Sequence, residues 1–233
     1  MKKILLLAGL ALLLIACTSK KEQASDAKQF KEEYESYNGK IRAKNNMENR
    51  TISIDEDNPF VYINSDELIK KIEGKEDFFL YLGSPECPWC RSNIEMAIEV
   101  GKENDIDTIY YLNIWDENGQ EIFRDLYDVV NGKVVQKVEG DPNYYKFIEY
   151  FDKYLDDYIL SDGDNQIDVN EKRVYIPLYM HISNGDVIEM TTGQAESQTD
   201  GYMELSDIVK QEQKKLFEKL FKVSTACSIE TKC

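Results

Sequence analysis

Two cysteines separated by two residues are the clearest sign of chemistry in this chain. The tetrapeptide CPWC at residues 87–90 follows an apolar run, Phe78–Leu82, and precedes a stretch with helical character that starts at Arg91. Two thiols at this spacing can close into a disulfide and reopen. The partial positive charge of a helix N-terminus, with Arg91 beside it, favours the thiolate of Cys87. The order strand, C-x-x-C, helix therefore predicts a redox-active pair, Cys87 and Cys90.

Other uses of this spacing stay open on the sequence alone. Cys87 and Cys90 could form half of a zinc site, or they could be inert. Attachment of a c-type haem needs His directly after the second cysteine, and Arg91 stands there. We favour the redox interpretation because of the strand-to-helix context.

The first seventeen residues predict export and lipid attachment. A short basic start, Met1–Lys3, precedes the apolar stretch Ile4–Ala16, which fits a signal peptide and is too short to span a bilayer comfortably. The stretch ends in LIAC at residues 14–17, which resembles a bacterial lipobox. The resemblance implies cleavage before Cys17 and attachment of acyl chains, such as palmitate, to that residue. A simple secretory signal followed by an unrelated cysteine is the alternative.

Composition fits an exported globular protein held at the membrane by lipid. Hydrophobic residues make up 42% of the chain, which is enough for a packed core. The formal net charge of −16 disfavours nucleic acid as a partner, and anionic lipids would repel the domain. We therefore expect the protein on the extracytoplasmic face of a bacterial cell membrane, anchored through Cys17.

Cysteine counting supports the same compartment. If Cys17 is lipidated, four of the five cysteines remain, and an even number suits an oxidising environment. Cys227 and Cys233 lie in the tail, and we expect a local structural disulfide between them. A second redox pair, a four-cysteine zinc site with Cys87 and Cys90, and two free thiols are the alternatives.

The chain divides into three parts. Residues 1–16 are the expected signal peptide, 17–57 a polar tether, and 58–233 one α/β domain. In this domain we expect strands at Phe60–Ile63, Phe78–Leu82 and Thr108–Ile114. We expect one helix with Ser65 as its N-cap, running through Glu73 and stopped by Gly74, and another helix after Cys90. The last two strands, joined through a helix, should be parallel.

Residues 116–170 read as a mostly helical insertion. A short helix is expected over Glu117–Val130, Asn131-Gly132 reads as a hairpin turn, and an aromatic stripe over Tyr144–Leu160 has helical spacing typical of core packing. The acidic segment Asp162–Asp168 fails the calcium-loop template and reads as a loop.

A proline then interrupts a strand-like run. Residues 173–182 are apolar apart from a few positions, but Pro177 cannot donate to a sheet, so an edge position or a cis bond is needed. Asn184-Gly185 predicts a turn into an antiparallel strand, Asp186–Met190, and a closing helix is expected over Met203–Phe221. His181, the only histidine, reads as a strand residue rather than a general base.

These features together resemble the thioredoxin family. The resemblance covers about residues 60–115 and 172–222, and the segment GSPECPWCRSNIEMA with the cysteine tail is similar to Gram-positive extracytoplasmic thioredoxin-like lipoproteins related to bacteriocin transport accessory proteins. It implies a thioredoxin-like three-layer α/β/α fold. It also implies that Cys87 attacks, that Cys90 resolves, and that Pro177 is cis and faces the disulfide.

The chain departs from thioredoxin at two positions beside the motif. Thioredoxin has a buried acid where this chain has Tyr81, and a tryptophan where this chain has Gly83. Proton transfer at Cys90 would then fall to Glu86 or to water. Fold analogy also leaves the direction of the reaction open.

The expected activity is thiol–disulfide exchange on exported proteins. A Cys87 thiolate attacks a substrate disulfide and Cys90 releases the product, or the reaction runs backwards. Trp89, Ile176 and Pro177 are the expected substrate contacts; exported cysteine-containing proteins and a membrane redox partner are the expected partners. No metal or cofactor beyond the Cys87–Cys90 disulfide is expected. A non-catalytic peptide-binding lipoprotein and a zinc-stabilised structural lipoprotein are the alternatives.

Overall fold

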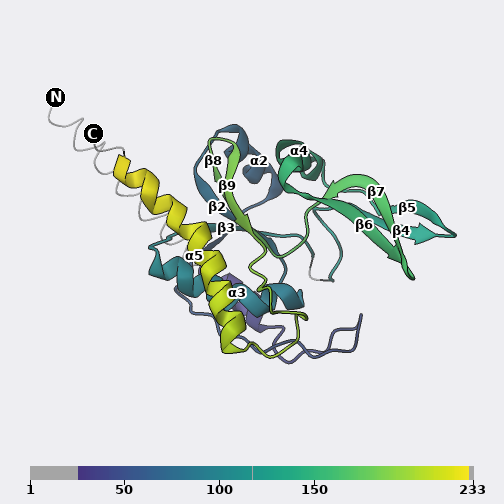
Figure 1. Cartoon of the computed structure of the whole chain (residues 1–233), viewed down its shortest axis with the longest axis horizontal. Coiled ribbons are helices and arrows are strands. Elements are labelled where there is room, and N and C mark those ends of the chain that lie inside the picture. Colours follow the sequence, from purple (N-terminus) through teal and green to yellow (C-terminus); the bar gives the residue numbers. More distant parts are fainter. Residues whose placement is uncertain (1–25, 117, 231–233) are drawn as a thin grey trace, which may run out of the picture.

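A five-stranded mixed sheet forms the centre of the protein (Figure 1). The computed structural model describes residues 26–116 and 118–230, with side chains through Lys222. The strand order is β1-β3-β2-β8-β9. The strands are β1 (Phe60–Tyr62), β2 (Phe78–Gly83), β3 (Ile109–Asn113), β8 (Leu178–Ser183) and β9 (Asp186–Thr191). β1, β3 and β2 run parallel and β8 and β9 antiparallel, which confirms the predicted parallel pair β2 and β3.

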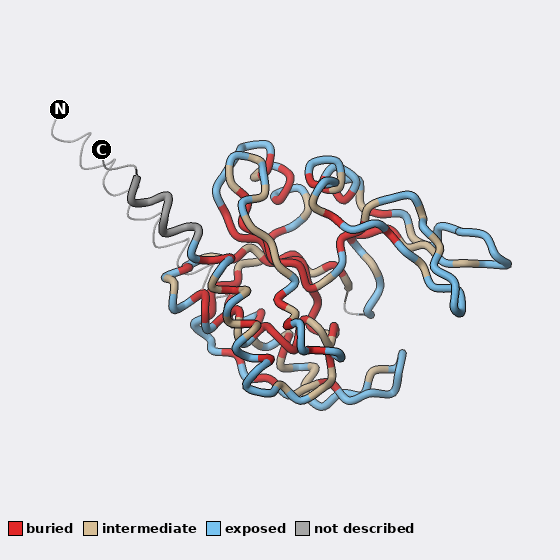
Figure 2. Tube along the Cα trace, viewed as in Figure 1, coloured by how far each residue is buried: buried red, intermediate tan, exposed pale blue. Residues whose placement is uncertain are grey.

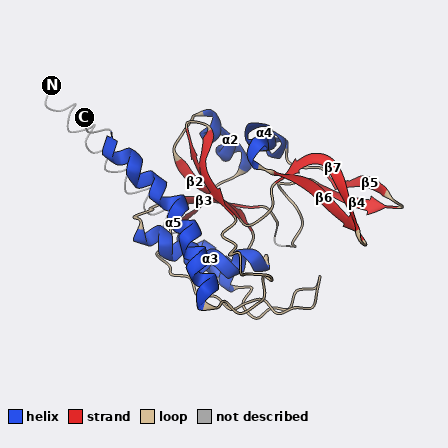
Figure 3. Ribbon diagram, in the orientation of Figure 1, coloured by secondary structure: helices blue, strands red, loops and turns tan. Residues whose placement is uncertain are grey.

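Helices cover both faces of this sheet (Figure 3), so the predicted α/β class is confirmed. Alternate residues of a strand point to opposite faces, and β2 is buried on both. Phe79 and Tyr81 join the core with α3 (Pro88–Glu103) and α5 (Asp207–Glu230). Phe78, Leu80 and Leu82 join the core with α2 (Ser65–Glu73) and α4 (Pro142–Phe151).

The start of α2 illustrates how local sequence fixes these elements. Asn64, not the predicted Ser65, is the N-cap, because its side chain accepts from the Glu67 backbone N–H while Glu67 reaches back to the Asn64 backbone. The helix ends at Glu73 and Gly74 caps it, as predicted.

The described part of the predicted tether belongs to the globular unit. A helix over residues 26–35, coloured purple in Figure 1, places Phe30 and Tyr34 in the core with no exposed surface. Ile52 and Ile54 are also buried, and Asn58 Nδ2 donates to the Ala27 carbonyl at 2.8 Å. The expectation of a solvated tether through residue 57 is therefore wrong for residues 26–57. The aromatic side chains of the helix pack into the core on one face of the central sheet.

Residues 116–170 are not mostly helical. The described residues contain two hairpins and one helix, and the hairpins project as an arm with little buried surface (Figure 2). The strands are β4 (Leu126–Val130), β5 (Lys133–Val138), β6 (Asp156–Asp162) and β7 (Asn165–Arg173), with a 3₁₀ turn η1 at Asp152–Tyr154. The predicted Asn131-Gly132 turn is confirmed, with positive φ at both residues.

Three expectations in this region differ from the structure. The region of the expected Glu117–Val130 helix contains Gly119 at φ +73 and β-branched valines that pair across the turn in β4 and β5, and residue 117 itself lies outside the described residues. The Tyr144–Leu160 helix stops at Phe151, after which the chain enters β6. Asp162–Asp168 forms the tight β6–β7 turn and the start of β7 instead of an open loop.

The chain returns to the central sheet through Ile176–Pro177, whose peptide bond is cis as expected. The Asn184-Gly185 turn and the antiparallel β8–β9 pair are confirmed. α5 starts later and ends later than the predicted Met203–Phe221, so it extends beyond the core contacts of Phe217, Leu220 and Phe221. The backbone of Cys227 falls within α5, but its side chain, like Cys17 and Cys233, lies outside the described residues, as does any disulfide there. No helix in the described part of the chain is long and apolar enough to cross a membrane.

Candidate functional site

The two motif cysteines lie where β2 meets α3. β2 ends at Gly83, three residues turn the chain, and Cys87 is the N-cap of α3. Pro88 occupies the first helical turn, where its missing N–H costs nothing because that group has no intrahelical partner. This geometry is the predicted strand, C-x-x-C, helix arrangement.

Both cysteines are free thiols, and Cys87 is the more acidic of the two. Cys87 is 5% exposed and Cys90 is fully buried. A hydrogen bond from the Cys90 thiol lowers the pKa of Cys87, and it outweighs burial with help from the Trp89 and Cys90 backbone N–H groups and from Arg42. Burial, together with the neighbouring Cys87, raises the pKa of Cys90 well above its ordinary value. These shifts favour the thiolate form of Cys87 and the protonated thiol form of Cys90.

Arg91 has a different task from the predicted one. Its guanidinium is buried and donates to the carbonyls of Tyr34 at 2.7 Å, Arg50 at 2.6 Å and Pro85 at 3.0 Å, and also to Asn38 Oδ1. These contacts tie the N-terminal segment to the turn before the motif. Arg91 therefore holds these two segments together and interacts with Cys90, whereas Arg42 is a cation that lowers the pKa of Cys87.

The sequence reasoning missed Arg42 because it comes from the segment that was expected to be a tether. Its side chain lies 3.6 Å from a Glu86 carboxylate oxygen and donates to the Tyr202 hydroxyl at 3.1 Å. Glu86 is thus engaged with Arg42. Beside Cys87, the side chain that interacts with Cys90 and lowers the pKa of Cys90 is Tyr81.

A loop before α5 covers the motif from the other side. A Cβ atom at Gly201 would lie 3.0 Å from the Pro88 Cβ and 3.0 Å from the Trp89 backbone nitrogen, so the loop backbone rests directly on the tetrapeptide. Arg50, from the N-terminal segment, donates to the Met203 carbonyl of this loop. Trp89 is half-buried and packs against the core that contains both cysteines.

Ile176 and Pro177 lie at the entrance to β8, the strand that pairs with β2. Ile176 is half-buried and packs against the same core as Cys87 and Cys90, and Pro177 is buried. The structure therefore brings Trp89, Ile176 and the two cysteines to one core cluster.

Four buried tyrosines lie beneath the cysteines. Tyr81 of β2 stacks between Tyr179 of β8, at 4.3 Å between ring centroids, and Tyr111 of β3, at 5.3 Å. The Tyr81 and Tyr34 hydroxyls are 2.8 Å apart. A Cβ atom at Gly83 would lie 2.2 Å from the Tyr81 hydroxyl oxygen, so glycine at 83 is what allows this ring position.

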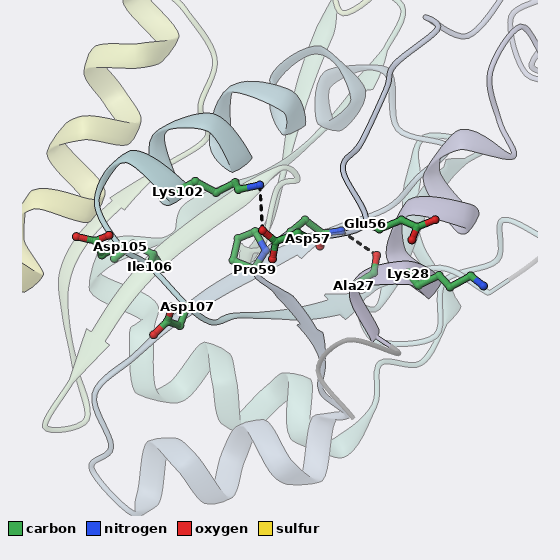
Figure 4. Close-up of a pocket in the computed structure, with 10 residues that line it drawn as sticks. Ala27, Lys28, Glu56, Asp57, Pro59, Lys102, Asp105, Ile106 and Asp107 are labelled. Carbon is green, nitrogen blue, oxygen red and sulfur yellow. Dashed lines mark hydrogen bonds and ion pairs between the residues drawn. The ribbon is translucent and has the colours of Figure 1, made fainter. Parts of the chain in front are cut away.

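Other candidate features lie away from this centre. His181 is a buried strand residue, as predicted, with Nε2 2.8 Å from an Asp77 oxygen and its ring stacked on Phe79. A surface pocket of about 770 Å³ lies where β1 and β3 begin, the opposite end of the parallel strands from the cysteines; Figure 4 shows Lys102 reaching toward Asp57 there. Within the described residues no group of three His, Cys, Asp or Glu side chains is placed to hold a metal ion.

No family model matches this chain, and no curated protein matches it.

Proposed function

We propose that the protein is a membrane-anchored, extracytoplasmic thiol–disulfide oxidoreductase with a thioredoxin-like fold. The observation that carries the proposal is the pair of opposite shifts at one helix N-terminus. The pKa of Cys87 is lowered while that of its neighbour Cys90 is raised. Attack on a disulfide needs a thiolate, and resolution needs a second thiol held in reserve beside it.

The fold order supports the finer assignment. A strand leads into the dithiol helix, a parallel strand follows, and an antiparallel hairpin entered through a cis proline precedes the last helix. This is the arrangement that the sequence resemblance implies. In this assignment the arm formed by β4–β7 is an insertion between β3 and the cis-proline strand β8.

The exchange proceeds in two steps. The Cys87 thiolate attacks one sulfur of a substrate disulfide, and a mixed disulfide forms as one substrate thiolate leaves. Cys90 then attacks the Cys87 sulfur, the second substrate sulfur leaves and takes up a proton, and a Cys87–Cys90 disulfide remains. In reverse, the oxidised pair converts a substrate dithiol to a disulfide. Exported cysteine-containing proteins are the proposed substrates, and a membrane redox partner resets the pair.

Trapping separates the roles of the two cysteines. Cys87→Ser should abolish reduction of insulin disulfides, whereas Cys90→Ser should accumulate mixed disulfides that a non-reducing gel resolves. Cys227→Ser, outside the motif, is the matched control and should keep activity. Full activity in both motif variants would overturn the proposal.

Peptide binding by the Cys87→Ser variant and a metal analysis address the two alternatives. A peptide-binding protein without turnover would bind substrate peptides equally well in the Cys87→Ser variant and show no trapped species. A structural zinc protein would contain metal by elemental analysis and lose thermal stability when a chelator removes it.

A further inference from the structure

We infer that Tyr81, supported by Tyr34, donates a hydrogen bond to the Cys90 thiolate as it forms and so accelerates the second step of exchange. The inference rests on the proposed function and assigns a further residue to it. Tyr81 contacts a reacting atom and is the catalytic residue of the pair; Tyr34 acts through Tyr81 and is a positioning residue.

The packing places the Tyr81 side chain in the same buried cluster as Cys90. Burial raises the pKa of the Cys90 thiol and interaction with the Tyr81 side chain opposes that shift, while the Tyr81 hydroxyl lies 2.8 Å from the Tyr34 hydroxyl. All three side chains are fully buried. The ring cannot turn away, because Tyr179 and Tyr111 stack on its two faces.

The second step needs hydrogen-bond donors at Cys90, and the Ser84 backbone N–H supplies one that lowers the pKa of Cys90; a side-chain donor would add to it. Cys90 must become an anion to attack the Cys87 sulfur, and a fully buried anion without a donor is costly. When Tyr34 donates to Tyr81 and Tyr81 donates to Cys90, the charge spreads over a short chain of hydroxyls. The phenol keeps its proton throughout; the proton that leaves Cys90 is balanced by the one that the departing substrate sulfur takes up.

Among the side chains around Cys90, Tyr81 is the one whose hydroxyl lowers the pKa of Cys90, together with the Ser84 backbone N–H. Titratable or charged groups surround Cys90 from its own helix, from the three central strands and from the N-terminal helix. Burial raises the pKa of each of the surrounding tyrosines, so they keep their protons. Arg91 is held by carbonyl oxygens of the N-terminal segment and of Pro85. The groups are Cys87, Arg91, Tyr81, Tyr111, Tyr179 and Tyr34.

Stopped-flow reaction with 5,5′-dithiobis(2-nitrobenzoate) tests the inference on the full chain carrying Cys17→Ser, Cys227→Ser and Cys233→Ser. The reduced motif should release two aryl thiolates in sequence: the first when Cys87 attacks the reagent, the second when Cys90 resolves the mixed disulfide. Tyr81→Phe should slow only the second phase, about tenfold, which corresponds to about 1.4 kcal/mol. It should also move the pH midpoint of that phase upward, because a thiol without its donor loses its proton less readily.

Tyr144→Phe is the matched control, since it removes an equally buried hydroxyl from the core on the opposite face of the sheet. It should leave the second phase and its midpoint near the wild-type values. Tyr34→Phe should give a smaller slowing than Tyr81→Phe, and it serves as the test if Tyr81→Phe does not fold.

The outcomes separate the two proposals. A wild-type chain that releases only one aryl thiolate would refute the oxidoreductase itself. A wild type with two phases, together with a Tyr81→Phe or Tyr34→Phe variant whose second phase keeps its rate and pH midpoint, would refute the role of the tyrosines alone.

Discussion

The ring of Tyr81 occupies the space that a side chain at position 83 would need. A Cβ atom there would lie 2.2 Å from the hydroxyl oxygen and 2.3 Å from the ring carbon that bears it. Positions 81 and 83 are therefore coupled: this placement of the Tyr81 ring requires glycine at 83. Neither could be interpreted from the sequence, because the contact between them depends on the direction of one side chain.

At the residue scale, the acidity of Cys87 depends first on Cys90 and less on Arg42. The Cys90 thiol donates to the Cys87 thiolate, and Arg42 adds a more distant positive charge. Loss of either raises the pKa of Cys87, so reaction with iodoacetamide should require a higher pH. We expect Cys90→Ala to move the midpoint upward by about one pH unit and Arg42→Gln by less.

Mass spectrometry of the alkylated Cys87 peptide measures these midpoints. Lys172→Gln, on the exposed arm, is the control cation and should leave the midpoint unchanged. A larger displacement for Arg42→Gln than for Cys90→Ala would reverse the assigned order of causes.

At the element scale, sequence patterns predicted the elements that local chemistry determines. The apolar run of β2, the Asn-Gly turns and the cap at Gly74 each carry their signal within a few residues. The patterns failed where the outcome depends on a distant partner. The stripe from Tyr144 keeps its helical spacing past the end of α4: Phe147 and Phe151 are buried from α4, whereas Tyr158 is buried from β6.

The N-terminal helix gives the sharpest test of such a distant partner. Phe30 stacks on Phe60 at 4.1 Å and on Tyr34 at 4.4 Å between ring centroids, with no exposed surface. Phe30→Ala should lower the free energy of unfolding by about 3–5 kcal/mol, because it leaves a cavity under an aromatic cluster. Urea denaturation measures this. Glu32→Ala, on the exposed side of the same helix, should change it by about 0.5 kcal/mol or less; equal effects would mean that the helix is not packed.

The base of the arm contains a buried carboxyl group with pH-dependent stability. Asp125 is 1% exposed and lies 3.2 Å from Arg173 Nη1, and burial together with the neighbouring Glu171 carboxylate raises the pKa of Asp125 to about 6. An unfolded Asp titrates near 3.8. Between these values the folded state holds a proton that the unfolded state releases, so stability falls as pH rises from about 4 to 6 and levels off above.

Asp125→Asn removes this titration. The variant should therefore lose less stability than the wild type between pH 4 and pH 7, by about 2 kcal/mol. Urea denaturation at several pH values measures the difference. Asp128→Asn, an exposed change on the same arm, should retain the wild-type slope, and a wild type whose stability rises over this range relative to Asp125→Asn would contradict the raised pKa.

At the scale of the whole molecule, the packed N-terminal segment shortens the connection to the proposed anchor. Eight residues, 18–25, separate Cys17 from the described helix, and a fully extended chain spans at most about 3.3–3.6 Å per residue. A lipid on Cys17 would therefore hold the domain within about 30 Å of the bilayer, much closer than a tether through residue 57 would allow.

The nature of the attachment can be tested with salt and detergent. The chain carries a net charge of −16, so anionic lipids repel it and electrostatic attraction would not hold it at the membrane. If acyl chains on Cys17 hold the protein, high salt should leave it in the membrane fraction and detergent should release it. Each buried methylene contributes about 0.8 kcal/mol to membrane binding, and salt does not screen this hydrophobic contribution.

Cys17→Ser should move the protein to the soluble exported fraction, whereas Cys227→Ser should stay with the membrane. Mass spectrometry of the detergent extract should find an N-terminus at Cys17 with added lipid mass; an unmodified chain that begins at Met1, or release of the wild type by salt alone, would rule out the lipid anchor.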